Sequence, residues 1–190
     1  MQKPDGYDEA KVSGERIQIR LGGHHCVIKQ VTEKQSKTGK DMIVVLLDFD
    51  KADDQPDLFG TSFKNDDRPE KKWPFNGTQY INTMDSKDKS KTSKSFKSFI
   101  TAFERSNNVT AVWGDNFCDQ FKGKKIGGVF GVVEEEYNGE VKKRHRLRWF
   151  CEDNRADSAS VPEPKLLNKP STGVNDFVNV PDGTAEEIPF

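Results

Sequence analysis

The sequence predicts an all-β domain of five strands, with one helix between the third and fourth strands, followed by a disordered C-terminal tail. Three observations support this prediction. Short apolar stretches of strand composition recur between residues 24 and 151. Only residues 93–108 show the helical spacing of apolar side chains. From residue 153 onward, prolines and small polar residues replace any regular apolar pattern, so this part lacks the apolar surface that folding needs.

The first two strands are expected to form a hairpin. Residues 24–32 are centred on Val27, and residues 42–49 form a strongly apolar run. The stretch between them, residues 33–40, is polar and contains a glycine, as expected of a turn. This turn carries three lysines: Lys34, Lys37 and Lys40.

The third strand is expected within residues 50–92, where long charged loops separate the apolar stretches. Residues 59–64 and residues 78–84 both have strand character. The register of the third strand therefore stays open, and so does the choice of aromatic residues that its exposed face presents.

A helix is expected from residue 93. Thr92 or Ser93 can cap its first turn, and the two asparagines at 107–108 suit its end. Its apolar residues recur at i, i+3, i+4 and i+7, which forms one stripe: Phe96, Phe99, Ile100 and Phe103. We expect this stripe to pack in the core.

The last two strands are expected to form a second hairpin. Residues 124–137 contain three glycines, which favour a bulge or a sharp bend of the kind found in a small closed barrel. Asn138-Gly139 is typical of a type I′ turn and leads into residues 141–151. The predicted order is three strands, a helix and two more strands, and the glycine-rich strand follows the helix. This is the order of the OB-fold, a five-stranded Greek-key barrel.

We therefore divide the chain into an N-terminal extension (1–20), an OB-fold domain (21–152) and a disordered acidic tail (153–190). The longest apolar run, residues 42–47, is too short to span a membrane. Three well-separated cysteines fit a reducing compartment. The expected setting is the cytoplasm of a bacterial host cell, without membrane contact. The oligomeric state stays open, and a homo-oligomer is compatible with the sequence.

The charges are unevenly distributed, although the net charge is only −1. Residues 152–190 hold eight acidic and three basic residues, which leaves 23 acidic and 27 basic residues in 1–151. The body therefore carries a net charge of +4 and the tail a net charge of −5. A basic body with an acidic tail favours a protein that binds a polyanion, with a tail that can compete for the binding surface.

The last strand gives the clearest binding signal. Strict alternation places four basic side chains on one face: Lys142, Arg144, Arg146 and Arg148. His145, Leu147, Trp149 and Cys151 then fall on the other face. Four like charges in a line repel one another, and a phosphate backbone across the strand would relieve that repulsion. The alternative is an edge strand that is charged to prevent aggregation.

A second group of residues interleaves basic with aromatic side chains. It comprises Arg68, Lys71, Lys72, Trp73, Phe75 and Tyr80. Nucleobases stack on exposed rings regardless of sequence, because every base has a π-face. Trp73 and Phe75 flank Pro74 in a polar stretch, so we expect at least one of the two rings to be exposed. Trp113 and Trp149 are expected in the core.

The C-terminal residues are expected to bind a partner protein. They are Glu186, Glu187, Ile188, Pro189 and Phe190. The Phe190 ring can fill an apolar pocket while its carboxylate meets a basic side chain of the partner. This end resembles the acidic C-terminal tip of bacterial single-stranded DNA-binding proteins, which recruits replication and repair enzymes.

The body resembles a known protein family along residues 23–28, residues 36–40 and the apolar second strand that follows them, and residues 121–124, 127–128 and 137–139. They are similar to the small OB-fold single-stranded DNA-binding proteins that phages and mobile elements encode, especially those of Gram-positive hosts. The resemblance implies a protein that coats single-stranded DNA without sequence preference in phage or mobile-element replication or recombination. It also implies that the tip recruits host or phage replication and repair proteins. We expect no enzymatic activity, no cofactor and no bound metal.

A metal-dependent nuclease is the first alternative. Candidate acids are Asp48, Asp50, the pair at 53–54 and the run at 134–136, and residues 140–142 match a short E-x-K pattern. No convincing partner acid is found on a paired strand, so solvated surface charge is the favoured interpretation. His24-His25-Cys26 offers metal-ligand atoms, but neighbours on a strand point to opposite faces. A protein-only adaptor is the second alternative.

Overall fold

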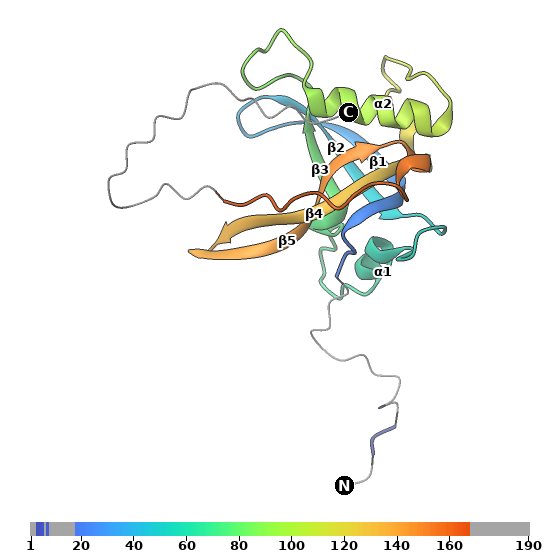
Figure 1. Ribbon diagram of the computed structural model, residues 1–190, viewed down its shortest axis with the longest axis vertical. Helices are drawn as coiled ribbons and strands as arrows, with labels where there is room; N and C mark the ends of the chain where they lie inside the picture. Colours follow the sequence, from blue (N-terminus) through green and yellow to red (C-terminus); the bar gives the residue numbers. More distant parts are fainter. Residues whose placement is uncertain (1–2, 6, 8–17, 168–190) are drawn as a thin grey trace.

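The computed structural model describes residues 3–5, 7 and 18–167, which form one antiparallel sheet of five strands with two helices (Figure 1). The strands are β1 (Gly22–Gln35), β2 (Asp41–Phe49), β3 (Thr78–Asn82), β4 (Lys125–Tyr137) and β5 (Glu140–Cys151). The helices are α1 (Leu58–Lys64) and α2 (Lys94–Asn107). Short 3₁₀ turns lie at η1 (Phe75–Gly77), η2 (Asp119–Phe121) and η3 (Asp153–Arg155). No helix among the described residues is long and apolar enough to cross a membrane.

The strands lie in the order β3-β2-β1-β4-β5, so β3 and β5 are the two edges of the sheet. Within the described residues no ladder of hydrogen bonds joins these edges, so the sheet is not closed into the barrel that we expected. Side chains bridge the gap instead: Arg146 of β5 contacts Phe75 and Asn76 of η1, directly before β3.

The structure confirms the predicted helix and the predicted turn at 138–139, both of which rest on local sequence signals. Ser93 caps α2, because its hydroxyl oxygen accepts a hydrogen bond from the Phe96 N–H at 3.1 Å. The helix ends at Asn107, and Asn108 caps it with a left-handed φ of 51°. Asn138 and Gly139 have φ values of 54° and 77°, the positive values that a type I′ turn requires.

The hydrophobic core lies between α2 and the inner face of the sheet. Phe99 and Phe103 of α2 pack against Phe121, with ring centroids 5.3 and 4.5 Å apart. The core also includes Ile19, which precedes the domain start that we expected at residue 21. The Ile19 carbonyl oxygen lies 2.5 Å from the Nδ1 atom of His145 on β5. The folded domain therefore begins before residue 21.

Residues 59–64 belong to helix α1, so the strand character expected there is wrong. The buried carboxylate of Asp48 on β2 accepts hydrogen bonds from the N–H groups of Phe59 (2.9 Å) and Gly60 (3.0 Å). The first N–H groups of a helix have no partner within the helix, so this carboxylate stabilises the start of α1. Burial raises the pKa of Asp48, although these hydrogen bonds oppose the shift.

A bulge in β5 changes which of its side chains share a face. The register shifts between Val129 and Phe130 of β4, which leaves Arg148 of β5 as an extra residue. Beyond it the alternation is reversed: Trp149 lies on the face of the basic residues, and Phe150 packs on the core. We expected strict alternation along the whole strand, and this prediction is wrong. The prediction that Trp149 lies in the core is wrong for the same reason.

The chain after β5 packs against the sheet as far as residue 167 and runs beside the β4–β5 hairpin (Figure 1). Lys165 forms a parallel bridge with Val133 of β4. At the start of this segment, Ala156 lies against Gly23 of β1. Only glycine permits this approach, because a Cβ atom at Gly23 would lie only 1.9 Å from the carbonyl oxygen of Ala156. The expectation of disorder from residue 153 is thus wrong for residues 153–167. The rest of that tail lies outside the described residues.

His25 of β1 ties this C-terminal segment to the sheet. Its ring nitrogens lie 2.9 Å from the carboxylate of Asp153 and 3.2 Å from that of Asp157. Partial burial lowers the pKa of His25, but the two carboxylates outweigh it and raise the pKa above its usual value. The protonated ring therefore stabilises this contact, and the stabilisation is lost as the pH rises through the raised pKa.

Candidate nucleic-acid interface

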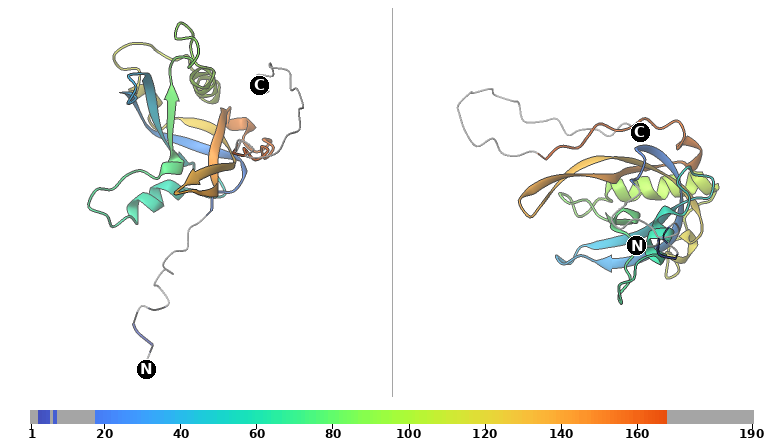
Figure 2. Two further views of the ribbon diagram at one scale, coloured as in Figure 1. Left: turned by 90° about the vertical axis from the view of Figure 1, so that its left-hand side faces the viewer. Right: turned by 90° about the horizontal axis from the view of Figure 1, so that it is seen from below.

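Two long hairpins project from the same side of the molecule, toward the left in Figure 1 and in the right-hand view of Figure 2. One hairpin joins β1 to β2, and the other joins β4 to β5. The sheet curls until β5 contacts η1, which places η1 and β3 between the two hairpins. Most of the residues that the sequence suggested for nucleic-acid binding lie on these elements.

The β1–β2 hairpin presents three exposed lysines: Lys34, Lys37 and Lys40. Its turn is fixed by hydrogen bonds from the Ser36 N–H to the Lys40 carbonyl oxygen (2.8 Å) and from the Gly39 N–H to the Ser36 carbonyl oxygen (2.9 Å). In the part of the chain that the structure describes, no ion pair joins any of the three lysines to an acid. Their charges are therefore available to an anionic ligand.

Two exposed rings lie between the hairpins. Phe75 of η1 and Tyr80 of β3 expose 63% and 58% of their surface. Tyr80 points away from the core because its neighbour Ile81 is buried, and successive residues of a strand face opposite sides. The structure thereby fixes the register of β3, which the sequence left open.

Arg146 of β5 is held against Phe75. Its guanidinium lies 4.3 Å from the centroid of the Phe75 ring and also bonds to the side-chain oxygen of Asn76. Two of its nitrogens donate to the Glu135 carboxylate, each at 2.7 Å. These hydrogen bonds hold the pKa of Glu135 below its usual value. Arg146 is thus a fixed, mostly neutralised cation beside an exposed ring.

The other cations of β5 differ from one another. Lys142 pairs with Glu140 at 3.1 Å, and Arg148 donates to the Glu163 carbonyl oxygen of the C-terminal segment at 2.8 Å. Arg144 is exposed and has no ion-pair partner among the described residues. The acidic run 134–136 of β4 lies directly opposite residues 141–143. The prediction that like charges repel one another along this strand is therefore wrong, because the facing strand β4 supplies counter-charges.

The loop after α1 holds the remaining suggested residues. Arg68 is paired with Asp66 at 2.6 Å, and the side-chain nitrogen of Lys71 donates to the Lys64 carbonyl oxygen at 3.2 Å. Hydrogen bonds from Arg68 lower the pKa of Asp66 to about 2. Lys72 is exposed. None of these bases contacts Phe75 or the β1–β2 hairpin in an ion pair or hydrogen bond among the described residues.

Trp73 is half-buried and packs against the core. Its indole N–H donates to the Leu47 carbonyl oxygen at 2.9 Å, and its ring centroid lies 5.4 Å from that of Phe63. A side chain with these contacts supports the fold. Of the two rings that flank Pro74, Phe75 is the exposed one, and Arg146 lies over it.

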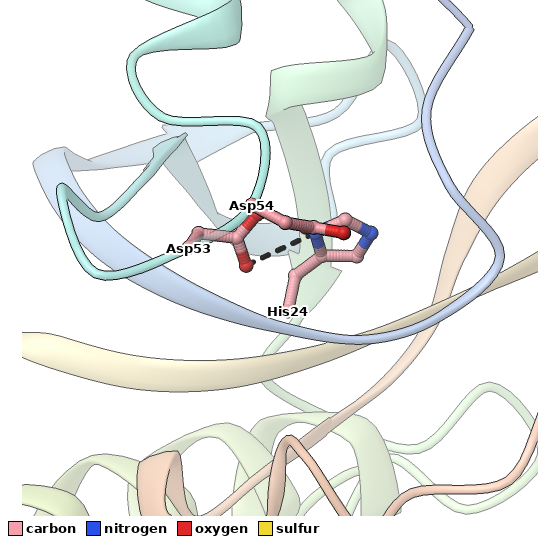
Figure 3. Close-up of side chains that lie close together, drawn as sticks. All are labelled: His24, Asp53 and Asp54. Atoms are coloured by element: carbon pink, nitrogen blue, oxygen red, sulfur yellow. Dashed lines mark hydrogen bonds and ion pairs between the residues drawn. The ribbon is translucent and has the colours of Figure 1, made fainter.

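Figure 3 shows a cluster that the sequence did not bring together. His24 of β1 is fully buried beside Asp53 and Asp54, which follow β2. Its Nδ1 atom lies 2.9 Å from the Asp53 carboxylate, and its Nε2 atom lies 2.9 Å from the Arg20 carbonyl oxygen. The ligand atoms of the three residues lie within 4.8 Å of one another, as a metal site would require.

Each group of this cluster already has a partner within the protein. The Asp53 carboxylate also accepts hydrogen bonds from the N–H groups of His25 and Gln55, both at 2.9 Å. Asp54 pairs with Arg20. Burial alone would raise the pKa of Asp53, but hydrogen bonds from the His24 ring and the Gln55 N–H lower it to about 2. The cluster therefore anchors the chain before β1 and the loop after β2 to the sheet.

Two exposed aromatic residues were not among the predicted binding residues. Trp113, which we expected in the core, is 64% exposed in the loop after α2. Tyr137 is 61% exposed next to the turn of the β4–β5 hairpin. A signal was available for Trp113, since it lies next to Gly114 and outside any apolar periodicity.

No family model matches the chain, and no curated protein matches it either. The expected partner-binding residues 186–190 lie outside the described residues. Recruitment of replication or repair proteins by this end therefore stays a prediction from the sequence.

Proposed function

We propose that the protein binds single-stranded DNA without sequence preference, with the strand lying along β3 between the two hairpins. One observation carries the proposal: the exposed rings of Phe75 and Tyr80 lie between cations from both hairpins. Phe75 remains 63% exposed although Arg146 lies over its ring, and Tyr80 is 58% exposed, so both rings offer surface to a ligand. Flat bases on a charged backbone fit rings beside cations.

The fold supports this proposal. The OB-fold is a partly open Greek-key barrel that binds oligonucleotides with strands 2 and 3 and with the loops between strands 1 and 2 and strands 4 and 5. The order β3-β2-β1-β4-β5, with Arg146 of β5 contacting η1 directly before β3, is compatible with such a barrel. Tyr80 on β3, Phe75 directly before β3 and the β1–β2 and β4–β5 hairpins would form the corresponding surface.

Two physical effects would share the binding. The unpaired lysines of the β1–β2 hairpin and Arg144 would attract phosphates and release counterions, which makes affinity depend on salt. Phe75 and Tyr80 would stack bases, which contributes roughly 1–3 kcal/mol per base and does not discriminate among sequences. Arg146 would meet the strand already oriented, because Glu135 and Asn76 hold its guanidinium in place.

A salt titration tests the electrostatic part. The affinity for a fluorescein-labelled oligothymidylate should fall linearly on a log–log scale as the sodium chloride concentration increases, and K37A or K40A should each reduce the slope by ~0.7. The matched control is R68A, because the Arg68 guanidinium is already engaged by Asp66 and its loss should leave the slope unchanged. Binding that does not respond to salt, or equal slopes for all variants, would contradict the proposal.

The same titration separates binding from cleavage. Asp48 accepts backbone hydrogen bonds at the start of α1, Asp53 is bonded to His24, and Glu135 is bonded to Arg146. These acids have structural partners, which favours a binding protein over the nuclease alternative. With magnesium added, the labelled strand should stay intact, and metal-dependent shortening of the strand would favour the nuclease.

A further inference from the structure

A cavity of about 650 Å³ lies between the outer part of the β1–β2 hairpin and α2. Small-molecule sites commonly occupy roughly 300–1,000 Å³. Residues that line this cavity include Glu33, Lys34, Met42, Met84, Phe96 and Trp113. Its walls are therefore partly aromatic, partly aliphatic and partly charged.

Trp113 is positioned as a stacking surface in this cavity. Its ring lies parallel to that of the buried Phe117, with centroids 4.9 Å apart and an interplanar angle of 12°. Phe117 lies against one face of the indole, Phe96 lies 6.2 Å away at an angle of 54°, and 64% of Trp113 remains exposed. The side chain of Gln120 braces the loop, because it bonds to both the N–H and the carbonyl oxygen of Val112. An indole held in this way can receive a base without reorganising.

The cavity opens at the end of β3, on the face of the sheet opposite to Tyr80. Its lining includes Ile43, which pairs with the buried Ile81. Tyr80 pairs with Val44 on the other face. The chain runs from Phe75 in η1 through Tyr80 in β3 to Met84, which lines the cavity. At roughly 3.3 Å per residue, Tyr80 and Met84 are separated by about 13 Å of extended chain. Because β3 is an edge of the sheet, a bound strand that crosses this edge at Met84 would reach both Tyr80 and the cavity.

The charges favour a base over a phosphate inside the cavity. Lys34 lines the cavity and also belongs to the unpaired lysines of the hairpin. Glu33 and Asp41 line the cavity as well, and their carboxylates repel a phosphate but can accept hydrogen bonds from the N–H groups of a base. The backbone would then stay with the hairpin lysines while the base enters.

We propose that this cavity takes one nucleobase of the bound strand, stacked on Trp113. The inference rests on the proposed single-stranded DNA binding and adds a site at α2 that lies beyond β3. It identifies Trp113 as a binding residue and extends the interface from the β4–β5 hairpin to the helix.

Tryptophan fluorescence of the full chain tests this inference. Acrylamide should quench Trp113 in the free protein, and saturating oligothymidylate should both quench its emission and shield it from acrylamide. Most of the emission change on DNA binding should disappear in W113F, whereas the matched variant W149F should keep it. Affinity should fall about tenfold in W113A, as expected for the loss of one stacked base, and should change less than about threefold in W113F.

The outcomes distinguish the inference from the proposed function. If the wild-type protein binds no oligothymidylate, both ideas fail. If it binds, but W113A has wild-type affinity or the emission of Trp113 does not change, this inference alone is overturned. If Trp113 is already shielded from acrylamide in the free protein, another occupant covers the cavity, and this result also overturns the inference. Circular dichroism melting should show that the W113A variant is folded.

Discussion

Replacing Phe75 or Tyr80 with alanine is expected to weaken oligothymidylate binding by roughly 1–3 kcal/mol per ring, about 5- to 150-fold in affinity. Each variant would lose the surface on which one base stacks. The melting temperature should change little, because both rings are mostly exposed in the folded protein. Fluorescence anisotropy titrations would measure the affinity, and oligoadenylate and oligocytidylate should lose similar factors because stacking tolerates every base.

The matched control is Y7A. Tyr7 is 63% exposed, similar to Phe75 and Tyr80, but it lies outside every strand. Its replacement should leave the affinity unchanged. Wild-type affinity in folded F75A and Y80A variants would show that bases do not stack between the hairpins.

Replacing Asp53 with alanine is expected to cause the largest loss of stability, about 3–5 kcal/mol in the free energy of unfolding. The substitution leaves the fully buried His24 ring and the N–H groups of His25 and Gln55 without their acceptor. Urea denaturation would measure the loss. D54A is the matched control, because Asp54 is about half-exposed and its pairing with Arg20 is a surface ion pair of about 1 kcal/mol or less. Equal losses in the two variants would contradict the anchoring role of Asp53.

The same carboxylate makes the stability depend on pH. The pKa of Asp53 is about 2, below its usual value of 3.8, so the folded protein favours the charged form. This group therefore contributes on the order of 2 kcal/mol above about pH 4, and the contribution is lost as the pH falls toward 2. In D53N this part of the acid sensitivity should be absent, whereas D54N should keep it.

The parts of the fold that could be predicted from sequence are those with local causes. Helix α2 carries its own cap at Ser93 and its own apolar stripe, and Asn138-Gly139 specifies the β4–β5 turn. Helix α1 could not be predicted because the carboxylate at its start comes from Asp48 on another element. The bulge at Arg148 likewise depends on how β5 packs against β4, which no local pattern reveals.

The candidate site was predicted less well than the fold. The exposure of the β1–β2 lysines and of Phe75 could be predicted because their polar surroundings are visible in the sequence. The counter-charges on β4 could have been anticipated, since a two-residue turn at 138–139 places Glu135 opposite Lys142. Packing of residues 153–167 could not, because it depends on contacts of His25 with acids far along the chain.

Photocrosslinking of an iodouracil-substituted oligonucleotide, followed by mass spectrometry of the protein, tests the central claim most directly, because it identifies the side chains that touch bases. The proposed binding mode predicts crosslinks at Phe75 and Tyr80, and the further inference adds Trp113. A salt concentration that abolishes binding should also abolish all of these crosslinks. Crosslinks confined to the segment 153–167, or no crosslinks at saturating oligonucleotide, would contradict a strand lying along β3 between the two hairpins.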